Sequence, residues 1–154
     1  MSDTQFAFAM LVGYLLTMVI ETTVLVALLS RRHSMRVRLF AGVWLTACTY
    51  PVVWLVLPGM FDDRASYLLV AETFAPVAEC AIFWFAFIRR PAKQPVEIIV
   101  DEWSVVPQPP QPVKRWATLR DMTAITLANL CSFGFGELLH AMNAFEPIVN
   151  MVKH

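Results

Sequence analysis

Four apolar stretches divide this chain, and each is about as long as the ~20 residues that a helix needs to cross a bilayer. They cover roughly residues 6–30, 39–61, 67–88 and 121–142. Only 16% of the residues are charged, whereas about a quarter of a typical soluble domain is charged, and the charges lie mainly between the stretches. The pattern predicts an all-α integral membrane protein, in which four transmembrane helices form a single domain over residues 1–154.

Two of these spans contain an internal proline. Pro51 lies in the second span and Pro76 lies in the third. Proline lacks a backbone N–H and leaves the carbonyl one turn earlier without its donor, so we expect spans two and three to be kinked. Kinked helices with freed carbonyl oxygens recur where membrane proteins handle ions, and they also occur in plain structural bundles.

The basic residues indicate how the spans are oriented. They gather in loops 31–38 and 89–120, whereas the connection between spans two and three holds one arginine. By the positive-inside bias, both basic loops are predicted to be cytoplasmic, with the N-terminus and a short C-terminal tail (143–154) outside. We expect a bacterial inner (cytoplasmic) membrane. The formal net charge is zero, which gives no electrostatic reason to expect a nucleic-acid partner.

The loop 89–120 is rich in proline and holds six of the ten prolines in the chain. Its run of proline and glutamine at residues 107–112 favours an extended polyproline conformation. The segment 96–106 is β-prone and apolar, but it is too short to form a domain. It is predicted either to lie on the membrane surface or to dock on a partner subunit.

Polar residues recur at matching depths in the spans. Counting ~1.5 Å per residue from the basic ends places one group ~15 Å deep and another ~25 Å deep. The first level holds Glu21, Glu79 and Asn129, and the second holds Glu72, Glu137 and His140. Charged groups are costly in hydrocarbon, so we expect these six residues to form an intramembrane polar seam that faces the bundle interior.

Small residues recur every four positions on the fourth span. They are Ala124, Ala128, Ser132 and Gly136. Such a ladder lets another helix approach closely, so it predicts a helix-packing face. The sequence leaves open whether the packed helix belongs to this chain or to another subunit.

The seam has three interpretations. The carboxyl groups of Glu21 and Glu79 can form structural hydrogen bonds between helices, or they can bind and release protons or cations. The Glu-x-x-His spacing of Glu137 and His140, together with Glu72, also suggests a metal site, because di-metal four-helix bundles use this spacing. No cofactor is firmly implied.

The chain has little mass outside its spans and several surfaces suited to docking. These features favour a small accessory or structural subunit of a larger membrane complex, surrounded by lipid and in contact with other subunits or with copies of itself. A proton- or cation-coupled transporter or channel element is the alternative, and the metal site is a second one. No phosphate-binding glycine loop, nucleophile elbow, His-Glu-x-x-His or Cys-x-x-Cys points to catalytic residues.

Overall fold

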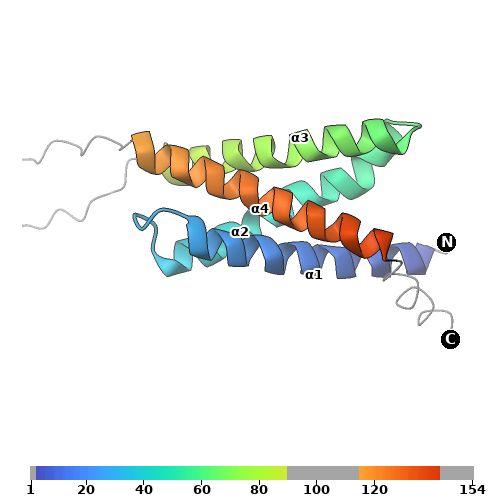
Figure 1. The fold of residues 1–154 in the computed structure, drawn as a ribbon, viewed down its shortest axis with the longest axis horizontal. Coiled ribbons are helices and arrows are strands. Elements are labelled where there is room, and N and C mark those ends of the chain that lie inside the picture. Colours follow the sequence, from blue (N-terminus) through green and yellow to red (C-terminus); the bar gives the residue numbers. More distant parts are fainter. Residues whose placement is uncertain (1–2, 90–114, 143–154) are drawn as a thin grey trace, which may run out of the picture.

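The fold consists of four long helices. The computed structural model describes residues 3–89 and 115–142, and all regular structure within these ranges is helical (Figure 1). The helices are α1 (Asp3–Leu28), α2 (Met35–Pro51), α3 (Arg64–Phe83) and α4 (Arg115–Ala141). With their helical extensions, all four are long and apolar enough to cross a membrane, which confirms the predicted all-α architecture.

The helix boundaries differ in places from those expected. Helix α4 begins at Arg115, ahead of the expected start at Asp121, so residues 115–120 belong to a helix and not to the loop. The rest of the proline-rich loop (90–114) and the tail (143–154) lie outside the described residues, and so do the predictions made for them.

The two proline-containing helices behave differently. Directly after Pro51, α2 passes into a π-helical turn, η1 (Val52–Val56), and then into a short 3₁₀ turn, η2 (Leu57–Gly59). In contrast, α3 continues through Pro76 as an α-helix and changes to a π-helical turn only at η3 (Trp84–Ile88). The helical hydrogen-bonding pattern therefore changes next to one proline but not at the other.

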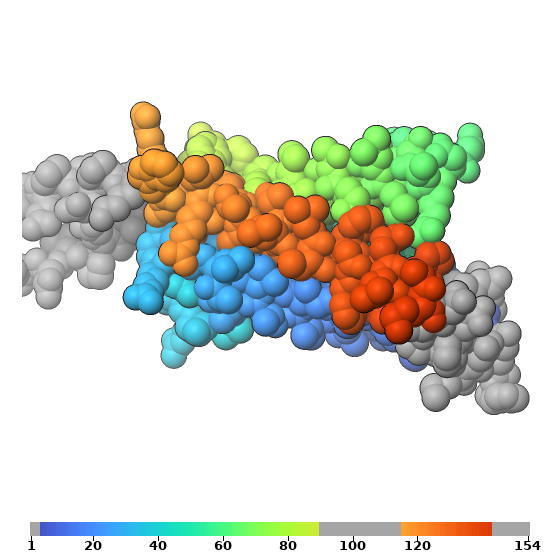
Figure 2. Space-filling model, in the orientation of Figure 1, coloured from blue at the N-terminus to red at the C-terminus, as the bar shows by residue number. Residues whose placement is uncertain are grey.

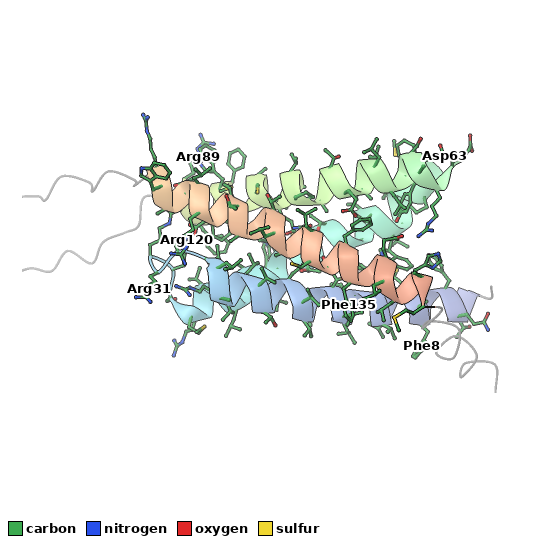
Figure 3. The ribbon with its side chains drawn as sticks, viewed as in Figure 1. Phe8, Arg31, Asp63, Arg89, Arg120 and Phe135 are labelled. Carbon is green, nitrogen blue, oxygen red and sulfur yellow. The ribbon has the colours of Figure 1, made fainter. Side chains whose placement is uncertain are left out.

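The four helices form an antiparallel ring. Each helix packs against the next one along the chain, and α4 closes the ring by packing along α1 (Figures 1 and 2). We call the end that carries Arg31, Arg89 and Arg120 the basic end, and the opposite end, which carries Phe8 and Asp63, the far end (Figure 3). This arrangement encloses an interior that residues of all four helices share.

Side chains satisfy the free backbone groups at the helix ends. The Ser34 side chain accepts a hydrogen bond from the Val37 amide at the start of α2. At the start of α3, the Asp63 carboxylate accepts one from the Ser66 amide at 2.8 Å, which holds the pKa of this exposed carboxyl below its ordinary value. These contacts fix where α2 and α3 begin.

Arginines satisfy the carbonyl oxygens where α1 ends. Arg38 donates to the carbonyl oxygens of Val26, Ser30 and His33 at 3.0–3.2 Å, and Arg120 donates to that of Leu28 at 2.9 Å. Cations at a helix C-terminus also favour the helix dipole. Two arginines counted in the sequence as topology signals therefore also hold α1 to α2 and α4.

The apolar core lies toward the basic end. Its buried side chains come from all four helices and are Leu25, Leu29, Ala41, Leu45, Phe83, Ala124, Ile125 and Ala128. Ala124 and Ala128 are rungs of the predicted small-residue ladder, so this part of the ladder packs within the chain. The ladder's other rungs, Ser132 and Gly136, lie farther along α4 and line a cavity.

A glycine allows α2 to approach α1 closely. A Cβ atom added at Gly42 would collide with the hydroxyl oxygen of Thr22 and would lie 2.7 Å from the Cα of Thr22. We expect Gly42→Ala to lower the free energy of unfolding by about 1–3 kcal/mol, because the Thr22 backbone would have to move.

Denaturant titration of the purified protein in mixed micelles measures this difference. Gly134→Ala is the matched control, because a Cβ atom at Gly134 meets no atom within 4 Å and alanine favours a helix more than glycine does. Equal stabilities of the two variants would contradict the close contact.

The outer surface of the bundle is strongly apolar. Val19 on α1 is 59% exposed and Leu69 on α3 is 71% exposed, and α2 and α4 expose Leu39 and Leu130 in the same way. Soluble monomers rarely expose contiguous apolar patches of more than a few hundred Å². A surface of this kind suits contact with lipid on every side of the ring.

Candidate functional site

Two glutamates lie buried at the middle of the bundle. Glu21 on α1 is 3% exposed, and Glu79 on α3 is 2% exposed. The hydroxyl groups of Thr46 on α2 and Ser132 on α4 lie 2.6 Å and 2.7 Å from the two carboxyl oxygens of Glu21. Both oxygens of this buried carboxyl group therefore have hydrogen-bond partners, as burial requires.

Glu79 has a corresponding pair of partners. The Thr49 hydroxyl lies 2.8 Å from one carboxyl oxygen, and the Asn129 amide nitrogen donates to the other at 2.7 Å. The second Asn129 N–H donates to the carbonyl oxygen of Ile125 at 3.1 Å. Both N–H groups of the Asn129 side chain therefore donate hydrogen bonds, which fixes the orientation of the side chain.

The two carboxyl groups belong to one connected set of side chains. The Ser132 hydroxyl lies 2.9 Å from the carbonyl oxygen of Asn129, so α4 links the partners of Glu21 to those of Glu79. We call this set the mid-bundle network: Glu21, Thr46, Thr49, Glu79, Asn129 and Ser132. The structure brings together the first level of the predicted seam, Glu21, Glu79 and Asn129. Ser132 was predicted only as a packing residue.

Each hydroxyl group of the mid-bundle network has a second acceptor within reach. Besides its carboxyl oxygen, Thr46 lies 2.9 Å from the carbonyl oxygen of Gly42, and Thr49 lies 3.1 Å from that of Leu45. Ser132 has the carbonyl oxygen of Asn129. A hydroxyl group has one hydrogen to donate, so each of these three must choose between a carboxyl oxygen and a backbone oxygen.

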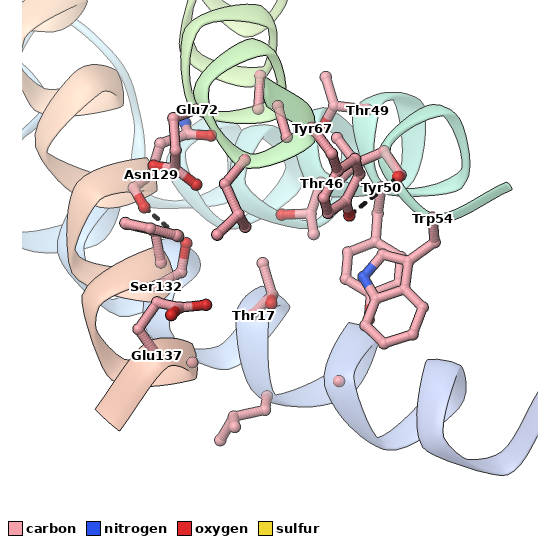
Figure 4. A pocket seen from close by; sticks show the side chains of 18 of the residues that line it. Thr17, Thr46, Thr49, Tyr50, Trp54, Tyr67, Glu72, Asn129, Ser132 and Glu137 are labelled. Carbon is pink, nitrogen blue, oxygen red and sulfur yellow. Dashed lines mark hydrogen bonds between the residues drawn. The ribbon is translucent and has the colours of Figure 1, made fainter. Parts of the chain in front are cut away.

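A cavity connects the network to the far end of the bundle. It encloses about 620 Å³ between the four helices. Its inner end is lined by the residues of the mid-bundle network other than Glu79. Figure 4 labels four of them: Thr46, Thr49, Asn129 and Ser132. Glu79 is not a lining residue, but it contacts the cavity wall through Thr49 and Asn129. The apolar core lies between the network and the basic end.

The second level of the predicted seam lines the same cavity nearer the far end. Glu72, Glu137 and His140 are all lining residues, and the Glu137 carboxylate pairs with Arg64 at 2.8 Å. Both side chains of this pair are more than a third exposed, so the pair contributes at most about 1 kcal/mol. Within residues 3–89 and 115–142, no group of three or more His, Cys, Asp and Glu side chains is arranged to hold a metal ion. The geometry gives the metal interpretation no support.

Aromatic rings form one wall of the cavity. Tyr50 and Trp54 stack with ring centroids 5.7 Å apart, and Phe6 lies 6.0 Å from Trp54. The Tyr50 hydroxyl donates to the carbonyl oxygen of Met10 at 3.0 Å, and a Cβ atom at Gly13 would collide with that hydroxyl. Figure 4 shows Trp54 across the cavity from Glu137.

A third buried carboxyl group lies at the basic end, and the sequence pattern did not indicate it. Asp121 of α4 has a fully buried side chain and accepts hydrogen bonds from the backbone and hydroxyl of Ser30 at 2.6 and 3.1 Å. Arg32 contacts the same carboxylate at 2.6 Å and His33 contacts it at 3.0 Å. In the sequence, Asp121 is notable only as an aspartate next to basic residues. Its partners could not be identified from the sequence, because they lie about 90 residues away in the loop between α1 and α2.

A comparison of the chain with protein-family models, with curated proteins and with solved structures finds no match. The function must therefore be inferred from the site itself.

Proposed function

We propose that this protein is a proton- or cation-coupled membrane carrier or channel element in which Glu21 and Glu79 exchange protons. The observation that carries the proposal is the placement of three hydroxyl groups, each between a carboxyl oxygen and a backbone carbonyl oxygen. This arrangement supplies hydrogen-bond partners for either protonation state of each carboxyl group.

The exchange at Glu21 requires only hydroxyl rotation. When Glu21 is ionised, Thr46 and Ser132 donate to its two oxygens. When a proton binds to the oxygen nearest Thr46, that O–H donates to the Thr46 oxygen, and the Thr46 hydrogen turns to the carbonyl oxygen of Gly42. No heavy atom has to move. Thr49 offers Glu79 the same exchange through the carbonyl oxygen of Leu45.

Access to the network supports the same proposal. The cavity opens a route from the far end to the network, while the apolar core and the Asp121 contacts close the basic end. In a carrier, this arrangement corresponds to a state that is open on one side. We propose that the predicted kinks at Pro51 and Pro76 help the helices to reach a second state, which is open toward the basic end. Pro76 lines the cavity, and Pro51 precedes the π-helical turn.

The proposal includes a location and an orientation. By the positive-inside bias, the basic end faces the cytoplasm of a bacterial inner membrane and the cavity opens outside. Arg89, directly after η3, lies 5.8 Å from the ring centre of Trp84, and Trp116 at the start of α4 is 82% exposed. Tryptophan and arginine at this depth suit a membrane–water interface.

Membership of a larger complex is a second proposal, compatible with the first. It is supported by the large apolar side chains that all four helices expose, since these can pack on other subunits as well as on lipid. Extraction in mild detergent tests it. A particle far heavier than the 17.5 kDa chain and containing other proteins is expected, and a partner-free monomer would contradict it.

The first proposal is tested with the purified protein in liposomes that contain a pH-sensitive dye. A potassium diffusion potential set by valinomycin supplies the driving force. We expect the protein to carry protons across the membrane faster than the leak of empty liposomes, or to do so when a cation gradient is imposed. A rate equal to the leak under every gradient would overturn the proposal.

A further inference from the structure

We infer that the cavity is a binding site for an organic monocation with an apolar, aromatic body. This inference rests on the proposed function, because it names the class of substrate that the same site would couple to protons. The cavity volume of about 620 Å³ falls in the range of small-molecule sites, which is about 300–1,000 Å³.

The charges that line the cavity favour a cation over an anion. Three carboxyl groups line it. Glu21 lies at the inner end, and Glu72 and Glu137 lie nearer the mouth, which is the opening at the far end. Among the lining residues in the part of the chain that the structure describes, Arg64 is the one arginine or lysine, and it is paired with Glu137. At the inner end, the ionisable group that lines the cavity is Glu21. A buried cation there gains a carboxylate partner, whereas an anion would meet a like charge.

The walls favour an organic ion over an inorganic one. Between the network and the mouth, the lining is largely apolar, with Ala71, Ala75, Val53 and Phe133 among its residues. A small inorganic cation needs several oxygen ligands to replace its water. These four side chains supply none, and the oxygens at the inner end are already hydrogen-bonded within the mid-bundle network. An apolar body, in contrast, would be stabilised by about 25 cal/mol for each Å² of surface removed from water.

The aromatic wall adds a direct attraction for positive charge. The stacked rings of Tyr50 and Trp54 line the cavity next to the helix turn that carries Thr46 and Thr49. Cations are attracted to the faces of tryptophan and tyrosine, and the attraction grows when water is excluded. A cation seated between Glu21 and these rings would be attracted by both.

Two glycines on α4 provide a matched pair of variants for the test. Gly136 lines the cavity, and Gly134 is exposed on the outer surface two residues away. A Cβ atom added at either position meets no atom within 4 Å, so a larger side chain creates no clash at its first atom. Gly136→Leu would fill part of the cavity, whereas Gly134→Leu would add the same side chain to the outer surface.

The probe is radiolabelled tetraphenylphosphonium, measured by equilibrium binding to the intact purified protein in detergent. Tetraphenylborate has the same shape and the opposite charge, so it controls for nonspecific apolar binding. We expect saturable binding of the cation, and no saturable binding of tetraphenylborate when it is measured separately. Both Gly136→Leu and Glu21→Gln are expected to weaken binding by about tenfold or more, and Gly134→Leu is expected to leave it unchanged.

Three results would overturn the inference: no saturable binding of tetraphenylphosphonium, equal binding of tetraphenylborate, or equal affinities of the two leucine variants. Flux measurements separate this inference from the proposed function. Proton flux without tetraphenylphosphonium binding would remove the organic-cation site and leave proton handling in place. Binding without any flux would keep the site and remove the carrier.

Discussion

Replacing Glu79 by glutamine is expected to abolish proton flux through the reconstituted protein and to leave its fold intact. Glu79 is 2% exposed, and both of its oxygens are hydrogen-bonded, to Thr49 and to Asn129. Glutamine has the same shape but cannot gain or lose a proton at accessible pH. If proton exchange at this position is the coupling step, the variant cannot perform it.

The hydrogen bonds around residue 79 explain why the fold should survive. The glutamine carbonyl oxygen can accept from Asn129 and its amide can donate to the Thr49 oxygen. The Thr49 hydrogen then turns to the carbonyl oxygen of Leu45, 3.1 Å away. Glutamine thus reproduces the hydrogen bonds of the protonated acid. Its second amide N–H gains no acceptor from these contacts, so the free energy of unfolding should fall by about 1–2 kcal/mol, which is less than the loss expected when a buried charge is left unpaired.

Glu137→Gln is the matched control for this experiment. Glu137 lines the same cavity, but its carboxylate lies near the mouth, where it pairs with the half-exposed Arg64. We expect Glu137→Gln to retain most of the flux, measured in the same dye-loaded liposomes. Flux that persists in Glu79→Gln, or that falls equally in both variants, would show that Glu79 has no special role.

Replacing Asp121 by alanine is expected to have the largest effect on stability, about 3 kcal/mol lost from the free energy of unfolding. Its fully buried carboxylate accepts hydrogen bonds from Ser30 and Arg32 and lies 3.0 Å from the His33 ring, and so joins α4 to the loop between α1 and α2. Alanine would leave the Ser30 amide without this acceptor. The Arg32 side chain is 27% exposed and would be hydrated once the aspartate is removed. The loss of stability should therefore lie near the lower end of the range measured for broken buried ion pairs.

Two controls accompany the Asp121 variant. Asp121→Asn keeps the size of the side chain and one acceptor oxygen, so it should lose about half as much stability. Glu137→Ala breaks an ion pair in which both partners are exposed, and it should lose less than about 1 kcal/mol. Denaturant titration in mixed micelles ranks the three variants. If Asp121→Ala were as stable as Glu137→Ala, the buried contacts would have no structural role.

Depth within the bundle could be predicted from the sequence because it depends on distance along each helix. Every helix has one end at the basic end, and each residue adds the same rise. Counting from the arginines therefore put Glu21, Glu79 and Asn129 at one level, and the hydrogen bonds join these three residues into one network. The same count put Glu72, Glu137 and His140 nearer the far end, where they line the cavity.

The rotation of each helix about its axis could not be predicted in the same way. Ser132 belongs to the ladder by its spacing, yet its hydroxyl group contacts Glu21, while the ladder residues Ala124 and Ala128 pack in the core. The apolar pattern places Asp121 at the start of the fourth span, and its partners lie about 90 residues away in the chain. These contacts depend on how helix faces pack, and that depends on side chains from distant segments.

Four membrane-length helices and the levels of their polar residues can be predicted from the sequence, because both follow from local composition and from a constant helical rise. The asymmetry between the two ends depends on tertiary packing: the apolar core closes the basic end, while a cavity opens toward the far end. That asymmetry arises because alanine and leucine faces pack tightly near the arginines. Toward the far end, Gly136 and the aromatic wall of Tyr50 and Trp54 line an open space.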